Sequence, residues 1–450
     1  MGKLSVFKRK GYGKMSQREK SEEKKEIQEK VNYCLHCKTS PCRTGCPLEN
    51  DIPSFIKAVK QGEVEKAYQI LSNTTVLSSI CGRICPHRKQ CQGNCIRGIK
   101  GEPASIGEIE AYIGDAMLED KDSLLNCYQE EIQENRVNNE KKIAVIGGGP
   151  AGLTAAAYLA RKGYTVTIFE REEKLGGILE YGIPEFRLDK EILAKTIAKI
   201  IALGIKVETG KALGKDYTLG ELEENYDAIF LGIGANIASE MGIEGEKLEG
   251  VYGGNQLLAK GRHPEYEGKI VAVIGGGNVA MDAARTIKRL GAKEVKVIYR
   301  RAEKQMPAEK KEIEDAKAEG IEFLFQNNVV KILGNKKGKV EKVECIKTKL
   351  IKKEGETREV PVNIEGSNYV LPMDYVVMAV GSKPEEKLIQ TLGLECNKWG
   401  YIQVNENYQT SKEKVFAGGD LAGFKATVAW AAKTGREAAK EIDRYISKIK

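Results

Sequence analysis

The sequence contains no continuous apolar run of the roughly 18 residues that a membrane-spanning helix requires. Its N-terminus, MGKLSVFKRKGYGKMSQREK, is basic and lacks the apolar segment of a secretory signal. No low-complexity tract interrupts the chain. These absences argue against a membrane or secreted protein. We therefore expect a cytoplasmic protein whose thiols stay reduced.

Histidine is scarce, with only 3 residues, and His36 and His87 lie inside cysteine-rich stretches where hydrogen-bonding or surface roles are more usual than ligation. Cysteine is abundant by comparison, and 8 of the 11 cysteines lie between Cys34 and Cys95. In a reducing compartment this clustering predicts metal binding or catalysis instead of disulfides. The scattered remainder are expected to be small buried hydrophobes: Cys127, Cys345 and Cys396.

The bulk composition is that of a globular chain, with 450 residues, 41% of them hydrophobic and 30% charged. This length predicts two or three domains. The net charge of +8 could suggest a nucleic-acid partner, but lysines alternate with glutamates in SQREKSEEKKEIQEK and KKEIEDAKAEG. Such stretches are typical of solvated helix faces, so we expect no nucleic-acid binding.

The chain changes character along its length. Residues 30–125 are cysteine-rich, with helical periodicity in IPSFIKAVKQGEVEKAYQILS and IGEIEAYIGDAML, and the polar run QEEIQENRVNNEKK then suggests a linker. From Lys142 a strand, an alanine-rich helix and a second strand predict a βαβ unit. The pattern returns 128 residues later, from Gly147 to Gly275, so two dinucleotide sites are expected.

The first glycine loop, GGGPAG, places Gly147, Gly149 and Gly152 in the G-x-G-x-x-G pattern between a strand and a helix. Such a loop allows a tight turn, close approach of a pyrophosphate and close helix packing. Glu170 ends the next strand, 23 residues after Gly147, where a carboxylate would accept from ribose hydroxyls. An ordinary tight strand–helix turn is the alternative.

The second loop has Gly275 and Gly277, with Ala280 in the third glycine position. Its second strand ends in Arg300 and Arg301 instead of an acid, and guanidinium groups can hold a 2′-phosphate. This site should therefore prefer NADP(H) over NAD(H), unless the arginines are ordinary surface residues.

A third nucleotide-site element lies near the C-terminus. KVFAGGDLAGFKATVAWAAKTG predicts a strand, a Gly-Gly-Asp turn and a helix. Asp420 and that helix N-terminus would suit a ribityl chain and a ring carbonyl. These features suggest FAD at the first loop.

Together these motifs resemble the two-nucleotide-domain flavoprotein disulfide reductases, and more closely the small subunit of NADPH-dependent glutamate synthase and its relatives. The relatives include the large subunit of electron-bifurcating NADH-dependent ferredoxin:NADP oxidoreductase. The resemblance runs from about Cys34 onward, through KLGGILEYGIPEFRL, GGGNVAMDAAR, YRRAEKQMPA and AGGD. A thioredoxin reductase is excluded because the second nucleotide domain has no C-x-x-C.

The resemblance implies an α/β fold of two Rossmann-like domains preceded by a helical domain with two [4Fe–4S] clusters. We expect residues 1–140 to form the helical domain and linker, 141–262 with 379–450 the FAD domain, and 263–378 the NADPH domain. At the FAD site it implies contacts from Glu170, Gly176, Gly177, Arg187, Asp420, Thr427 and Ala429. The predicted cofactor contacts also take in Pro150, Ala151, Asn278 and Gly419.

The spacing C-x2-C-x4-C-x3-C-P differs by two residues from the bacterial ferredoxin run. By resemblance, the first cluster takes Cys34, Cys37, Cys42 and Cys95, and the second takes Cys46, Cys85, Cys91 and a non-cysteine ligand at Glu110. Alternatively Glu110 is an exposed helix residue and Cys81 completes the second cluster. Two four-thiolate zinc sites are a further alternative.

The resulting hypothesis is an oxidoreductase that takes hydride from NADPH onto FAD and passes electrons through two clusters to a partner, as the glutamate synthase small subunit does. The partner would be the large synthase subunit or another electron-accepting flavoprotein or ferredoxin. The bifurcating oxidoreductase subunit is the alternative, and a non-enzymatic electron-transfer or assembly subunit is a third.

Overall fold

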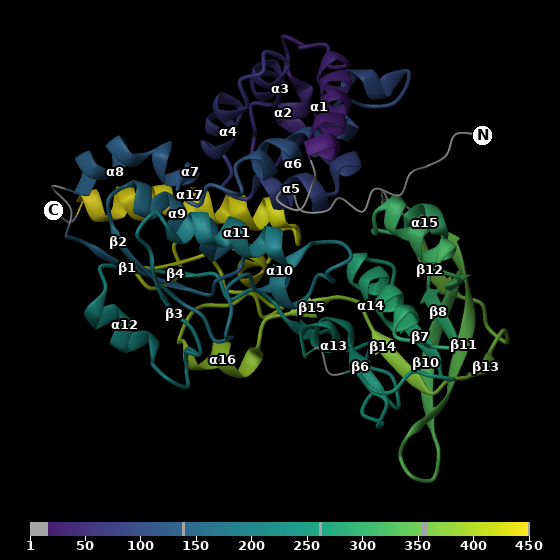
Figure 1. Cartoon of the computed structure of the whole chain (residues 1–450). Coiled ribbons are helices and arrows are strands. Elements are labelled where there is room, and N and C mark those ends of the chain that lie inside the picture. Colours follow the sequence, from purple (N-terminus) through teal and green to yellow (C-terminus); the bar gives the residue numbers. More distant parts are fainter. Residues whose placement is uncertain (1–16, 137–139, 261–262, 353–358, 449–450) are drawn as a thin grey trace. The chain divides into compact units, whose positions relative to one another are not determined.

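The computed structural model describes residues 17–136, 140–260, 263–352 and 359–448, and these fold into two compact units (Figure 1). The first unit comprises Met1–Glu180, Glu185–Gly234 and Glu386–Lys450, and the second comprises Tyr181–Pro184 and Ala235–Glu385. The chain thus passes between units near 234 and 385, and residue 262 of the predicted boundary lies outside the described residues.

The cysteine-rich region of the first unit consists of short helices. Its helices are α1 (Gln17–Asn32), α2 (Pro41–Gly45), α3 (Ile52–Lys60), α4 (Val64–Ser72), α5 (Ser78–Ile84), α6 (Ile106–Ala116), α7 (Ser123–Asn126) and α8 (Gln129–Arg136). Three single turns, η2 (His87–Lys89), η3 (Gln92–Asn94) and η4 (Ile96–Ile99), lie between α5 and α6. The periodic stretch after Asp51 becomes two helices because Gly62 has a positive φ of 82° between them.

The expected linker QEEIQENRVNNEKK is wrong over its first part, which is helix α8. Ile132 of α8 is 3% exposed, and α8 packs against α9 (Pro150–Arg161). The side chains of Glu131 and Asn135 also contact Arg161 of α9, so tertiary contacts hold this polar sequence as a helix. Residues 137–139 of the same stretch lie outside the described residues.

The first unit also contains a parallel sheet in the order β16-β4-β1-β2-β3. Its strands are β1 (Lys142–Ile146), β2 (Thr165–Phe169), β3 (Lys206–Glu208), β4 (Ala228–Leu231) and β16 (Val415–Ala417). Helices α9, α11 (Lys190–Ile201) and α17 (Val428–Lys448) lie over one face, while α12 (Leu219–Asn225) and α16 (Glu386–Thr391) lie over the other (Figure 1). Because the strands are parallel, the loops after β1, β2 and β16 meet at one edge.

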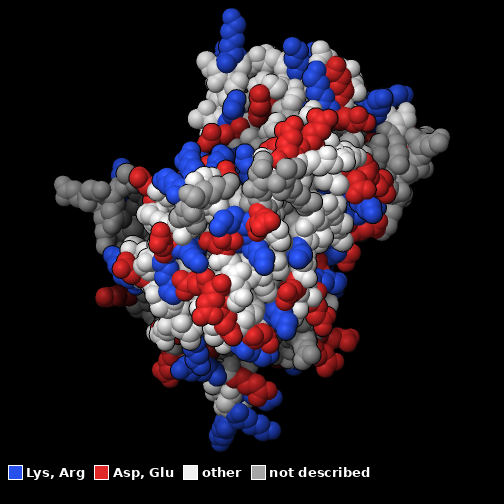
Figure 2. Space-filling view, turned by 90° about the vertical axis from the view of Figure 1, so that its left-hand side faces the viewer, with Lys and Arg blue, Asp and Glu red and all other residues white. Residues whose placement is uncertain are grey.

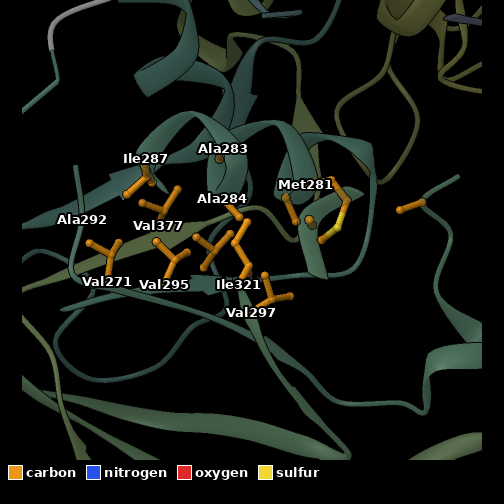
Figure 3. Close-up of a cluster of buried hydrophobic side chains, with 14 of the residues drawn as sticks. Val271, Met281, Ala283, Ala284, Ile287, Ala292, Val295, Val297, Ile321 and Val377 are labelled. Atoms are coloured by element: carbon orange, nitrogen blue, oxygen red, sulfur yellow. The ribbon is translucent and has the colours of Figure 1, made fainter. Parts of the chain in front are cut away.

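The second unit repeats this arrangement with the parallel order β6-β14-β7-β8-β9. Its strands are β6 (Val251–Gly253), β7 (Ile270–Ile274), β8 (Glu294–Tyr299), β9 (Glu322–Phe325) and β14 (Tyr375–Met378). Figure 3 shows Met281 and Ile287 of α14 (Asn278–Arg289) over Val271, Val295 and Val297 of the sheet. This core fixes the start of α14 beside the strand ends.

Antiparallel strands cover the other face of this second sheet. They are β10 (Asn327–Gly334), β11 (Val340–Ile351), β12 (Val360–Asn363) and β13 (Tyr369–Pro372). The smaller elements are α10 (Ile178–Tyr181), β5 (Ile237–Ala238), α13 (Gly254–Lys260), η5 (Glu303–Gln305), α15 (Lys310–Ala318), β15 (Ser382–Lys383) and η6 (Gly419–Ala422).

One face of the molecule carries charges of both signs. Figure 2 shows Lys and Arg side chains interleaved with Asp and Glu over the face in view, without a broad area of one sign. Among the described helices, none is long and apolar enough to cross a membrane.

Candidate cofactor and cluster sites

Two glycines of the first loop are required by the fold itself. Gly147 has a φ of +97°, and a Cβ there would lie 2.7 Å from the Gly232 carbonyl oxygen. A Cβ on Gly152 would lie 1.9 Å from the carbonyl oxygen of Gly147. The tight turn and the close approach of α9 to β1 therefore explain both residues without any ligand.

The middle glycine of each loop has no such explanation. Gly149 and Gly277 have ordinary φ values of −79° and −92° and cap α9 and α14. The nearest atom that an added Cβ would meet is 3.9 Å away at Gly149 and 4.0 Å away at Gly277. Neither backbone strain nor protein packing demands glycine here, whereas a phosphate approaching the helix N-terminus would.

The predicted residues around the first loop are brought together. Glu170 accepts hydrogen bonds from the amides of Gly148 at 2.8 Å and Glu172 at 2.9 Å, so its carboxylate also braces the loop. The Gly176 amide donates to the Gly148 carbonyl at 2.8 Å, and a Cβ on Gly177 would lie 2.9 Å from the Gly149 Cα. Pro150 and Ala151 form the first turn of α9.

The Gly-Gly-Asp turn lies against the same loop. A Cβ on Gly419 would lie 3.2 Å from the Ala151 Cβ. Burial raises the pKa of Asp420 to about 6, and no group in the described part of the chain donates a hydrogen bond to its carboxylate. A ribityl hydroxyl would supply the missing donor.

The remaining predicted contacts lie on both sides of these loops. Thr427 begins the α17 turn by accepting from the Trp430 amide at 3.3 Å, and Ala429 is buried. Arg187 is half-buried just before α11. The structure brings Thr427 and Ala429 to the carboxyl edge of the sheet, after β16.

The second loop has two arginines beside it. Arg300 and Arg301 directly follow β8, which is parallel to β7, so they lie at the strand edge that carries Gly275 and Gly277. Arg300 is exposed, and the Nε of Arg301 is buried without a hydrogen-bond partner among the described residues. Asn278 accepts from the Glu309 amide at 3.0 Å and so ties the following loop to α14. An unsatisfied guanidinium beside a phosphate loop fits an anionic ligand.

The first predicted cysteine set surrounds one cavity. Cys34, Cys37, Cys42 and Cys95 line it together with apolar side chains that include Ile52, Ile56 and Ile106. The Ala104 amide donates to the Cys95 sulfur at 3.5 Å, as in sulfur ligation where backbone amides stabilise negative charge. The structure thus brings these four thiols together, and their ligation of a cluster stays a prediction.

The second set converges on Glu110. The Glu110 carboxylate is 5% exposed, and burial raises its pKa to about 8. Burial and the Glu110 charge together raise the pKa values of Cys46 and Cys91, and the Cys81 thiol hydrogen-bonds Cys85 and raises its pKa with burial. Both proposed fourth ligands, Glu110 and Cys81, therefore lie beside the other three, and the choice between them stays a prediction.

The cysteines form no disulfides in the structure. All eleven cysteines are free. Within the described ranges, no three His, Cys, Asp or Glu side chains have the mutual arrangement of a metal site. A donor set of thiols with one carboxylate, buried in apolar surroundings, nevertheless fits iron–sulfur chemistry better than a histidine-based site.

Close helix packing puts Glu110 in place. A Cβ on Gly82 of α5 would lie 2.4 Å from the Ala111 nitrogen on α6, and one on Gly114 would lie 2.4 Å from the Ser79 Oγ. Arg83 of α5 also forms a partly buried bidentate ion pair with Asp115 of α6. Because α5 and α6 approach so closely, Cys81 and Cys85 come alongside Glu110.

Sequence reasoning missed two buried polar residues next to this set. Asn50 is 1% exposed and Arg436 5% exposed, and both contact Thr74. The only sequence signal is a polar residue inside an otherwise apolar stretch, which is weak for a single asparagine.

Comparison with known proteins now identifies the family. Residues 141–439 match the family described as pyridine nucleotide-disulphide oxidoreductase, and residues 12–122 match dihydropyrimidine dehydrogenase domain II, 4Fe-4S cluster. The small chain of glutamate synthase [NADPH] from Escherichia coli is 34% identical over 92% of this chain and 90% of its own length. The chain belongs to the glutamate synthase small-subunit family of pyridine nucleotide-disulphide oxidoreductases. The predicted family and fold class are thereby confirmed.

Further relatives share only part of their length with this chain. The beta subunit of NADP(+)-dependent formate dehydrogenase from Moorella thermoacetica is 38% identical over 91% of this chain, which spans 60% of that subunit. Among solved structures, FprA of Mycobacterium tuberculosis in complex with NADPH superposes with a TM-score of 0.61 over 69% of this chain and 85% of FprA. At 19% identity this likeness shows the fold.

The matches also confirm the predicted class of chemistry. The chain is an oxidoreductase with nucleotide-binding folds and a 4Fe-4S domain, and FAD, NADPH and [4Fe–4S] clusters are the cofactors that agree with both family matches.

Proposed function

We propose that this chain is the electron-input subunit of a larger enzyme, taking electrons from NADPH and delivering them singly to a partner. The observation that carries the proposal concerns Gly149 and Gly277. The protein has room for a side chain at both positions, so the fold itself does not require glycine there. When bound, FAD accepts a hydride from NADPH and the clusters conduct single electrons.

The residues of the chain bind and orient these groups. The α9 and α14 N-termini receive pyrophosphates at Gly149 and Gly277, and Asp420 accepts from the flavin's ribityl chain. Arg300 and Arg301 hold the 2′-phosphate of NADPH. Hydride transfer to a flavin requires no protein acid or base, so the chain contributes position and electrostatics.

The cysteine sets hold two clusters, one at Cys34, Cys37, Cys42 and Cys95 and one at Cys46, Cys85, Cys91 and Glu110. The partner is proposed to be a large synthase subunit, which agrees with relatives named as a small chain and as beta subunits of other NADP-linked oxidoreductases. Those names equally allow a different electron acceptor.

Two single-atom substitutions test the observation directly. An alanine methyl at Gly149 or Gly277 meets no protein atom closer than 3.9 Å, so both variants should fold and lose at most the ~1 kcal/mol typical of alanine at a helix N-cap. Gly149→Ala should weaken FAD retention, while Gly277→Ala should keep FAD and lower kcat/KM for NADPH with a dye acceptor. Native FAD retention and native NADPH turnover in the two variants would refute the nucleotide sites.

The cluster assignment is tested by metal analysis of the anaerobically purified chain. We expect about eight irons per chain, from two four-iron clusters. Zinc in place of iron would refute the assignment. If Cys81→Ala lowers the iron content while Glu110→Ala does not, Cys81 is the ligand instead of Glu110.

A further inference from the structure

Asn50 is a buried amide with both polar atoms engaged. It lies four residues after Cys46, and it is 1% exposed. Its Oδ1 accepts from the Thr74 hydroxyl at 2.7 Å, and its Nδ2 lies 3.4 Å from Oε1 of Glu110, a long hydrogen bond. The amide group of Asn50 therefore donates toward Glu110, while its oxygen accepts from Thr74.

The same loop is held from the flavin-binding fold. Arg436 of α17 is 5% exposed, and its Nη1 donates to the carbonyls of Leu48 at 2.9 Å and Thr74 at 3.0 Å. Lys433, one turn earlier, forms an ion pair with Glu49 at 3.2 Å. Contacts with α17 thus fix the backbone on both sides of the Asn50–Thr74 hydrogen bond. This helix begins at Val428, directly after Thr427.

We propose that Asn50 is a positioning residue for the second cluster, acting through Glu110. It donates to Oε1 of the carboxylate, so that Oε2 would be the oxygen available to iron, and Thr74 sets the orientation of the amide. The inference rests on the proposed function, because it assumes that Glu110 is a ligand. A hydrogen bond to a ligating carboxylate tunes both its orientation and its charge, as outer-shell partners of metal ligands do.

The test uses three substitutions that leave every proposed ligand in place. Asn50→Leu keeps the volume and removes the donor, Thr74→Val removes the hydroxyl that orients the amide, and Thr74→Ser retains it. In anaerobic redox titrations followed by electron paramagnetic resonance, Asn50→Leu and Thr74→Val should shift the midpoint potential and spectrum of one cluster only. Thr74→Ser should match the native chain.

Tyr128→Phe is the control for a general loss of packing, because it removes hydroxyl contacts with Ser72 and Asn73 in the same helical region. It should leave both cluster signals unchanged. Native potentials and spectra in both Asn50→Leu and Thr74→Val would overturn the inference, as would an equal effect of Tyr128→Phe. A native chain without iron would instead overturn the proposed function, and with it this inference.

Discussion

Two arginines are expected to decide the choice between pyridine nucleotides. Each charge-assisted hydrogen bond from Arg300 or Arg301 to the 2′-phosphate should be worth about 1.5–3 kcal/mol, or roughly 10- to 150-fold in kcat/KM. Replacing both by glutamine should therefore reduce kcat/KM for NADPH by at least that factor and leave NADH nearly unaffected. Steady-state assays with a dye acceptor measure both values.

Lys293 provides the matched control for the arginines. It is exposed just before β8, at the opposite end of that strand from Arg300. Lys293→Gln should not change either nucleotide's kcat/KM. If the double arginine variant loses NADPH and NADH activity equally, the arginines do not bind the 2′-phosphate.

Lys199 of α11 is a buried lysine that should make the stability of the chain depend on pH. It is 4% exposed, its Nζ donates to the Met117 carbonyl at 3.2 Å, and it lies 4.3 Å from the Tyr68 ring centroid. Burial lowers its pKa to about 8 from an ordinary 10.5. Between these two values the native state releases the proton before the unfolded state does, so stability from this group rises with pH.

Lys199→Met should therefore remove a pH-dependent contribution to stability. The native chain should gain melting temperature relative to the variant as pH increases from about 8 to 10, and lose that gain as pH falls through 8. Thermal melts of the two proteins at matched pH values measure the difference. A difference that stays constant over this range would show that Lys199 does not titrate as its burial requires.

At the scale of elements, the contact between α5 and α6 is the one that the second cluster depends on. Gly82→Ala would place a methyl group 2.4 Å from the Ala111 nitrogen and 2.5 Å from the Gly107 carbonyl oxygen, and neither backbone atom can give way. The helices should separate at a cost of about 1–3 kcal/mol. Because α5 leads into Cys85 and α6 carries Glu110, iron content should fall from about eight to about four per chain.

The FAD content of Gly82→Ala should remain native, since the glycine loop of α9 is untouched. Gly220→Ala in α12 is the control, because its nearest neighbour, the Thr218 Oγ1, is 4.0 Å from the added methyl. That variant should keep both iron and flavin. Full iron content in Gly82→Ala would show that the close helix contact does not position the second cluster.

The sequence predicts the elements that leave a local pattern and misses those that depend on tertiary contacts. The two βαβ units are predictable because a buried parallel strand, a glycine turn and an alanine-rich helix each leave a local pattern, and the structure has both. The polar sequence of helix α8 predicts a linker because the contacts that stabilise the helix are tertiary: Ile132 is buried, and Glu131 and Asn135 contact Arg161 of α9. Asn50 could not be found for the same reason, since its partners lie 24 and 60 residues away.

At the scale of the whole molecule, cysteine spacing predicts two sets of cysteines, but it does not predict how the fold brings the members of each set together. The convergence of Cys34, Cys37 and Cys42 with Cys95 depends on a chain excursion through five helical segments between them. Family resemblance alone predicts Glu110 as a ligand, and the structure places it buried beside Cys46 and Cys91, while its ligation stays a prediction. The proximity of Glu110 to these cysteines is visible only in the folded structure.

The last prediction concerns what the chain can do alone. All of its proposed chemistry is electron handling, and neither cysteine set leaves a nucleophile with an adjacent base for releasing ammonia from an amide. The isolated chain should therefore oxidise NADPH with an artificial acceptor but form no glutamate from glutamine and 2-oxoglutarate. Adding a large synthase subunit should restore NADPH-linked glutamate formation, measured by following glutamate and NADPH together. Glutamate formation by the chain alone would overturn the input-subunit proposal, whereas ferredoxin reduction coupled to NAD, without synthase activity, would favour the bifurcating alternative.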